Sequence, residues 1–171
     1  MSLPFHWRVT RYDPALRDGQ GLYPLGDWSC LSDVGQVFNG RQLTYEDYAV
    51  SETAYTNAAV AFLTDAGVDA LRLVYLDRCV EAVDATQGRD IRIAPDSLHA
   101  GSTVGKADLP DVVRLNLREI IWCKLAAKDR FYLHFGWDFY AYVGSISPSA
   151  EAIRQAEASG LYVEPMKSPH L

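Results

Sequence analysis

The chain has 171 residues, of which 49% are hydrophobic and 22% are charged, as in an ordinary globular protein with a sizeable core. Its net charge of −6 argues against a nucleic acid or a membrane surface as partner and is compatible with a basic protein partner. No apolar run reaches the length of a membrane span and the start lacks a signal-peptide pattern, so we expect a cytoplasmic protein. Three cysteines without paired spacing, Cys30, Cys79 and Cys123, are expected to be reduced thiols.

The first half of the chain predicts one strand and one long helix. The alternating aromatic and branched residues of Phe5–Tyr12 predict the strand. Residues 44–66 predict the helix, because Thr44 can cap its first turn together with Asp47. The apolar residues of this helix gather on one side of the helical wheel, and Glu52 is the single charge among them.

The second half begins with a strand expected at Asp69–Asp77 and a weaker one at Asp90–Ala94. Residues 95–107 are polar and contain glycine, which predicts an irregular segment. Residues 110–125 predict a second main helix. Its apolar arc is wider than that of a surface helix, so we expect it to be covered on most sides.

Residues 130–144 predict an aromatic hairpin. We expect a register in which Leu133 faces Ala141, because it places all the phenyl rings on one face, whereas a slip by one residue would expose them. The loop is then the three residues 136–138, with a left-handed residue at its first or last position. The phenyl face should pack on the second helix. The other face carries Tyr and His, and it is either covered by another element or binds something.

Helices and strands are segregated along the chain more than they alternate, which favours the α+β class over a parallel α/β sheet. We expect one domain, residues 1–171, in which an antiparallel sheet including the hairpin packs against the helices 44–66 and 110–125. A serine-capped helix that ends at Ser159 and a last strand at Leu161–Glu164 complete the prediction.

Four short motifs are distributed along the chain. They are YDP at Tyr12–Pro14, SDVG at Ser32–Gly35, FNG at Phe38–Gly40 followed by Leu43-Thr44, and FGWDFYAYVG at Phe135–Gly144. Together they resemble a family of small, uncharacterised bacterial proteins. The resemblance covers most of the chain and implies a bacterial, cytosolic origin. No activity is attached to that family, so the resemblance implies no catalytic residue.

Glu52 and the arginines of the second helix are the first candidate site. A carboxylate on an apolar helix face needs a partner. Arg118 or Arg114 would satisfy it, in a pair that is bidentate if the geometry allows. Such a pair is either a structural ion pair in the core or part of the lining of a pocket.

His134 with Tyr132, Tyr140 and Tyr142 is the second candidate site. Histidine transfers protons near neutral pH, so a general acid/base cluster is one interpretation. A recognition surface that also includes Trp137 is another. A third is ordinary packing with hydrogen bonds, and in a homo-oligomer the same face would be the subunit interface.

Other kinds of site find little support. Gly101–Lys106 is similar to a phosphate loop, but it has three residues between its glycines instead of four, and Ala107 stands where Ser or Thr would hold Mg²⁺. The four histidines are scattered without the spacing of metal ligands. We therefore expect neither a metal nor another cofactor.

The favoured function is that of a non-enzymatic protein-binding module, of the toxin-neutralising (immunity) type or regulatory. It would hold a basic protein through an acidic and aromatic surface. The alternative is a small enzyme whose pocket is built from Glu52, Arg118 and His134. A cleft that joins these three residues would favour the enzyme, and an exposed aromatic patch with acidic neighbours would favour the binding module.

Overall fold

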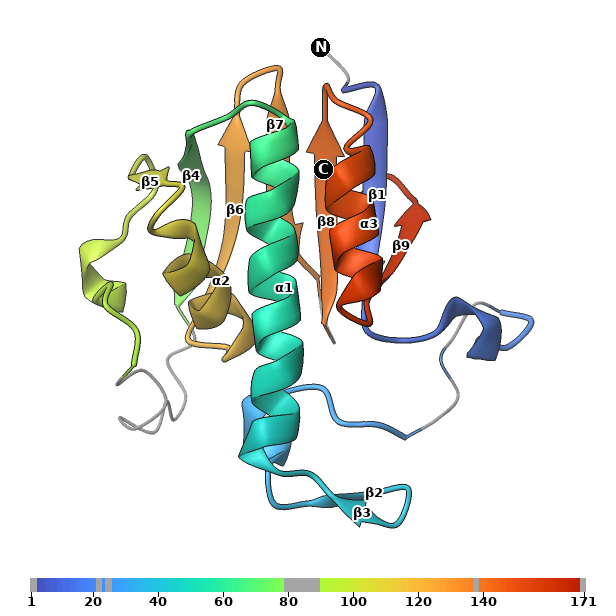
Figure 1. Ribbon diagram of the computed structural model, residues 1–171. Helices are drawn as coiled ribbons and strands as arrows, with labels where there is room; N and C mark the ends of the chain where they lie inside the picture. Colours follow the sequence, from blue (N-terminus) through green and yellow to red (C-terminus); the bar gives the residue numbers. More distant parts are fainter. Residues whose placement is uncertain (1–2, 21–22, 24–25, 79–89, 137–138, 170–171) are drawn as a thin grey trace.

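The computed structural model describes residues 3–20, 23, 26–78, 90–136 and 139–169. Seven strands within these ranges form one sheet, in the order β5-β4-β6-β7-β8-β1-β9, and every neighbouring pair is antiparallel (Figure 1). The strands of this sheet are β1 Phe5–Thr10, β4 Ala70–Arg78, β5 Thr103–Gly105, β6 Ile121–Ala127, β7 Phe131–Phe135, β8 Tyr140–Ser145 and β9 Tyr162–Pro165. A separate hairpin consists of β2 Val37–Phe38 and β3 Arg41–Gln42.

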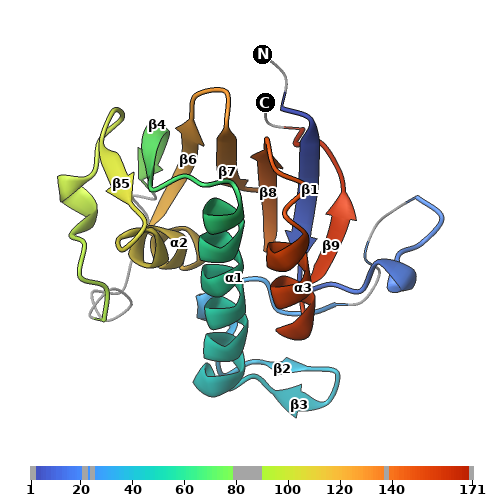
Figure 2. The ribbon, with the colours of Figure 1, turned by 45° about the horizontal axis from the view of Figure 1, so that its top comes forward.

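Three helices lie together on one face of the seven-stranded sheet, as Figures 1 and 2 show from two directions. They are α1 Tyr45–Asp65, α2 Leu109–Leu117 and α3 Ala150–Ala158. Short 3-10 helices lie at Pro14–Leu16, Leu31–Asp33 and Pro95–Ser97. The long α1 crosses the middle of the sheet between α2 and α3, and the β2–β3 hairpin lies beyond its N-terminal end (Figure 1). This arrangement confirms the predicted α+β class with an antiparallel sheet.

The main helix forms where the sequence predicts it. The Thr44 side chain accepts a hydrogen bond from the Asp47 N–H, and the Asp47 carboxylate accepts one from the Thr44 N–H, which completes the predicted capping box. The buried face of α1 contributes Tyr55 and Phe62 to the core. These rings pack against the helix-facing side chains of the sheet, among them Leu133. Burial of this apolar surface is the main stabilising term of the fold.

The predicted helix over 110–125 is wrong in its second half. The helix α2 ends at Leu117, and Glu119 adopts a left-handed conformation with φ 58°. The N–H groups of Ile120 and Glu119 return to the carbonyls of Leu115 and Asn116, at 3.0 Å each, in the pattern of a Schellman motif. The chain then continues as β6, where buried and half-exposed residues alternate with a period of two.

The side chain of Asn116 fixes this change of direction. Its Oδ1 accepts a hydrogen bond from the Cys123 N–H at 3.0 Å, and its Nδ2 donates to the Val112 carbonyl at 2.9 Å. One amide therefore ties α2 to the strand that follows it. The wide apolar arc predicted for a single helix is the sum of a helix face and a strand face.

The predicted hairpin forms, but its register is shifted by two residues. Leu133 faces Val143 instead of Ala141. A shift by two preserves the faces, so the phenyl side still points toward the helices. It packs on α1 and not, as predicted, on the second helix, because α1 is the helix that crosses the middle of the sheet. The left-handed residue described in the turn is Phe139, with φ 60°. Its ring is buried near Trp28 and Tyr55, and the Tyr55 hydroxyl donates to its carbonyl, so tertiary packing of Phe139 sets the turn.

Two smaller predictions also fail. Residues 90–94 form no strand, and residues 103–105, predicted to be irregular, form the edge strand β5 beside β4. The glycine-rich run that is similar to a phosphate loop thus lies at a sheet edge. None of the helices within the described ranges combines the length and hydropathy that a membrane span needs.

Candidate functional site

Glu52 and Arg118 form the bidentate ion pair that the sequence predicts. Glu52 comes from the middle of α1, and Arg118 is the residue that follows the last turn of α2. Arg118 Nε and Nη2 donate to Glu52 Oε1 and Oε2 at 2.7 and 2.8 Å. Both residues are only 4% exposed, so the pair lies inside the protein. Arg114, the other predicted partner, is 3.8 Å from the same carboxylate and half-buried.

Two further groups complete this network. Arg118 Nη1 and Nη2 also donate to the two oxygens of Asp90, at 2.5 and 2.9 Å. The Tyr48 hydroxyl donates to Glu52 Oε1 at 3.2 Å. The guanidinium therefore lies between two carboxylates, and the network joins α1, the end of α2 and the segment at residue 90.

The electrostatics of this network favour the charged forms of Arg118 and Asp90 and the neutral form of Tyr48. Hydrogen bonds to Glu52, and then to Asp90, raise the pKa of Arg118 above its ordinary value despite burial. The hydrogen bonds from Arg118 lower the pKa of Asp90. Burial, followed by the charge of Glu52, raises the pKa of Tyr48. Arginine stays protonated at neutral pH, and its N–H groups are taken up by carboxylates from two segments, so this geometry suits cohesion between elements.

His134 lies on the opposite face of the sheet from this network. Its neighbours in β7, Leu133 and Phe135, point into the core under α1, so the alternation of the strand turns His134 away from the helices. The strand registers place it in one row of six side chains across the sheet: Tyr75, Lys124, His134, Tyr142, Arg8 and Glu164. The structure therefore does not bring Glu52, Arg118 and His134 into a common pocket.

The Tyr/His face, defined by Tyr132, His134, Tyr140 and Tyr142, is largely buried. Exposure is 7% for Tyr132, 2% for His134 and 5% for Tyr142, whereas Tyr140 is half-buried. Trp137, the remaining residue of the predicted binding surface, lies outside the described residues. Burial also raises the pKa of Tyr132 and of Tyr142. Of the two outcomes expected for this face, the structure shows the covered one.

The C-terminal segment contributes to this cover. Ser168 Oγ forms a short hydrogen bond with His134 Nε2, and the Met166 N–H donates to the His6 carbonyl at 3.1 Å. His6 Nδ1 in turn lies 2.9 Å from the Tyr132 hydroxyl. The Tyr132 ring lies against Gly144 so closely that a Cβ at that position would be 2.1 Å from Cε1. These contacts are those of packed residues, and they accompany the burial of His134.

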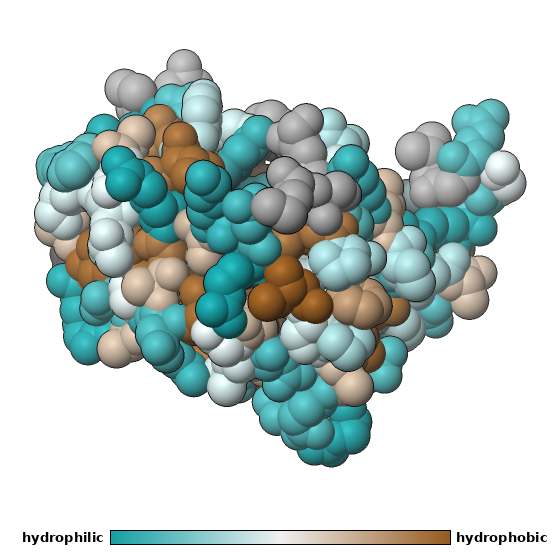
Figure 3. Space-filling view, turned by 90° about the horizontal axis from the view of Figure 1, so that it is seen from above, coloured by the Kyte–Doolittle hydropathy of each residue, from teal (hydrophilic) through white to brown (hydrophobic). Residues whose placement is uncertain are grey.

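A different surface is exposed at the N-terminal end of α1, and no sequence motif indicated it. We call it the helix-end surface. Its residues are Asp33, Val37, Tyr45, Glu46, Asp47 and Val50. Three of them are large apolar side chains with high exposure: Val37 at 66%, Tyr45 at 46% and Val50 at 69%. The end opposite to it, seen in Figure 3, shows mostly hydrophilic side chains with apolar ones in small separate groups.

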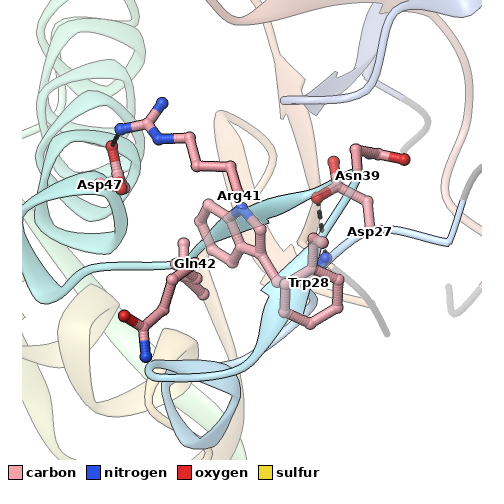
Figure 4. A pocket seen from close by; sticks show the side chains of 8 residues that line it. Asp27, Trp28, Asn39, Arg41, Gln42 and Asp47 are labelled. Carbon is pink, nitrogen blue, oxygen red and sulfur yellow. Dashed lines mark hydrogen bonds and ion pairs between the residues drawn. The ribbon is translucent and has the colours of Figure 1, made fainter.

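A pocket of about 190 Å³ lies beside this surface, between the β2–β3 hairpin and the chain at Trp28 (Figure 4). It is lined by Asp27, Trp28, Phe38, Asn39, Arg41, Gln42, Leu43 and Asp47. Arg41 pairs with Asp47 at 2.6 Å. Asp27 pairs with Arg11 of the segment that follows β1, at 2.9 Å. The Arg11 guanidinium carbon is 3.7 Å from the centroid of the Trp28 ring, in a cation–π contact.

Across the described ranges, no three His, Cys, Asp or Glu side chains are grouped so that they would hold a metal ion.

Comparison with models of protein families, with curated proteins and with solved structures gave no match. The resemblance to a bacterial family therefore remains a prediction from its short motifs.

Proposed function

We propose that this chain is a non-enzymatic binding module that holds a basic protein at its helix-end surface, in a toxin-neutralising (immunity-type) or regulatory role. The observation that carries the proposal is the exposure of Val37, Tyr45 and Val50 beside carboxylates at one end of the molecule. Monomeric proteins seldom expose such side chains together without a use for them, and Tyr is enriched in the contacts that dominate protein interfaces.

The placement of these residues supports contact with another protein. The β2–β3 hairpin belongs to no larger sheet and extends beyond the layer of helices and strands (Figure 1). Hydrogen bonds connect its ends to the turn at Asp33, since the Gln36 side chain donates to that carboxylate at 3.3 Å. The ion pair between Arg41 and Asp47 joins the hairpin to the first turn of α1, so the hairpin, this turn and the helix start lie together at one end.

The negative charge of the helix-end surface favours a basic partner. Glu46 is exposed, and within the described ranges no cation lies at ion-pair distance from it or from Asp33. The chain as a whole carries the same sign, with a net charge of −6. Complementary charge raises the rate of association and excludes acidic competitors.

The test is a capture experiment with matched variants. The tagged chain is incubated with lysate of its source cell at low and moderate salt, and bound proteins are identified and then purified. We expect a stoichiometric basic protein that is lost as salt rises. A variant with Val37→Ser, Tyr45→Ser, Glu46→Lys and Val50→Ser should lose it. The control, Val74→Ser with Tyr75→Ser, removes two exposed apolar side chains on β4 and should retain it.

The two roles separate in a second step with the purified partner. A toxin-neutralising role predicts that an equimolar amount of this chain abolishes the activity of the partner. A regulatory role predicts that the activity changes without being abolished. Recovery of the chain alone, or equal capture by the four-residue variant and the wild type, would refute the proposed function.

A further inference from the structure

The pocket beside the helix-end surface is small for a metabolite. Its volume of about 190 Å³ is below the range of roughly 300–1,000 Å³ that small-molecule and cofactor sites span. It is open to solvent and lies beside the projecting hairpin (Figure 4). A single long side chain of a docked protein is an occupant of the right size.

The lining contains the kinds of group that bind a guanidinium, although Arg11 already pairs with Asp27 and Arg41 with Asp47. Asp27 and Asp47 contribute carboxylates from two different segments, and Trp28 and Phe38 contribute aromatic rings. Hydrogen bonds from Thr44 are the main reason that the pKa of Asp47 is lowered, so this carboxylate is charged at neutral pH. The Trp28 ring already receives the guanidinium of Arg11 in a contact that it makes within the protein.

Arg41 shows how a guanidinium fits at the pocket. Its side chain extends from the hairpin, and Nη2 donates to Asp47 Oδ1 at 2.6 Å (Figure 4). The Arg41 side chain is nevertheless 77% exposed. Exposed ion pairs of this kind contribute little to stability, so the exchange of Arg41 for another guanidinium has a low cost.

From these contacts we infer that the pocket binds an arginine side chain of the basic partner, which displaces Arg41 from Asp47 and lies against Trp28. Arginine suits the site better than lysine, because its planar fork pairs with a carboxylate through two N–H groups and stacks on an indole. This inference rests on the proposed function for the origin of the arginine, but the binding itself does not require the partner.

The experiment uses N-acetyl-arginine amide as the probe and NMR of the full chain as the readout. The indole N–H signal of Trp28 should shift on titration, whereas N-acetyl-lysine amide should bind several-fold more weakly and N-acetyl-norleucine amide should not bind. Arg41→Gln removes the resident competitor and should strengthen arginine binding about two- to fivefold, as expected for loss of an exposed pair. Asp47→Asn, in which the side-chain amide can still cap the helix, should weaken it.

The matched control is Arg154→Gln. Arg154 also forms an exposed ion pair, with Glu151 at 2.5 Å, but on α3 and outside the pocket lining. This variant should leave the affinity for the probe unchanged. The inference is overturned if Trp28 does not respond, if lysine amide binds as well as arginine amide, or if Arg41→Gln and Arg154→Gln have the same effect.

The two proposals fail in different ways. If the four-residue variant loses a captured partner but the arginine probe does not bind the pocket, the proposed function stands and the inference about the pocket is wrong. If the probe binds as expected but no basic protein is captured, the pocket is a guanidinium site and the proposed function is wrong.

Discussion

The guanidinium of Arg118 and the carboxylate of Glu52 share two hydrogen bonds, at 2.7 and 2.8 Å, although 66 residues separate them in the sequence. The pair connects α1 to the point at which α2 turns into β6. Because both groups are buried, loss of either one leaves a buried charge that has lost its bidentate partner, with Asp90 still beside Arg118, or the more distant Arg114 still beside Glu52.

Replacement of Glu52 by Leu should therefore destabilise the protein by about 3–5 kcal/mol, and Arg118→Met by a similar amount. The double replacement should be less damaging than the sum of the two, because it leaves no buried charge of the pair unmatched. Urea unfolding of the four proteins gives the coupling free energy. Additive effects would show that the two side chains act independently.

Acid should weaken the protein through Glu164. Hydrogen bonds from Arg17, and then those from Arg8, hold the pKa of Glu164 below its ordinary value of 4.5 in the folded state. The stabilisation from this lowered pKa is complete above the pKa of the unfolded chain and is lost as pH falls through that of the folded state. The free energy of unfolding should therefore decrease below about pH 4.5.

Glu164→Gln should lower the free energy of unfolding at pH 7 and make its loss in acid shallower. Urea denaturation at several pH values between 7 and 3 is the measurement. Glu157→Gln, at an exposed position of α3, is the control and should match the wild type. If the free energy of unfolding of Glu164→Gln fell with pH in parallel with that of the wild type, Glu164 would not be a cause of the acid sensitivity.

Because the Tyr132 ring lies against Gly144, we expect a single added methyl group at Gly144 to lower the stability of the protein strongly. Gly144→Ala would place a Cβ at 2.1 Å from the ring, so the ring must move, and we expect a destabilisation of about 1–3 kcal/mol. In a Tyr132→Ala background the same replacement should be nearly neutral. Gly26→Ala, where no atom lies within 4 Å of the new Cβ, is the control. Equal costs in both backgrounds would contradict the ring contact.

Removal of the C-terminal segment should expose the Tyr/His face. In a chain that ends at Pro165, Ser168 no longer contacts His134, and Tyr132 gains access to water. Since burial is the cause of the raised pKa of Tyr132, this pKa should fall toward its ordinary value of 10. NMR of the tyrosine ring carbons during an alkaline titration measures it, with a chain that ends at Pro169 as control. An unchanged pKa would mean that another element buries the ring.

Local patterns predicted the long helix and the class of the fold well, because capping and periodicity act over a few residues. Thr44 and Asp47 fix the start of α1 without help from distant parts of the chain. The end of α2 was missed, because Glu119 is not a residue that normally adopts a left-handed conformation. The signal that was available is the alternation of buried and half-exposed residues in Ile121–Ala127, which a single helical wheel conceals.

The candidate site was predicted only where it depends on charge in an apolar setting. Glu52 stood out as a lone carboxylate on an apolar face, and its partner Arg118 followed from the need to neutralise it. The cover over His134 depends on Ser168, which lies 34 residues away and has no distinctive pattern. The helix-end surface was missed for the same kind of reason, since the exposure of Val37 and Val50 follows from tertiary placement alone.

The two edges of the large sheet have a consequence for association. They are its shortest strands, β5 with three residues and β9 with four. β9 also ends in Pro165, which has no N–H to donate. These short edge strands offer few backbone groups of their own to an added strand, which disfavours edge-to-edge growth at β5 and β9.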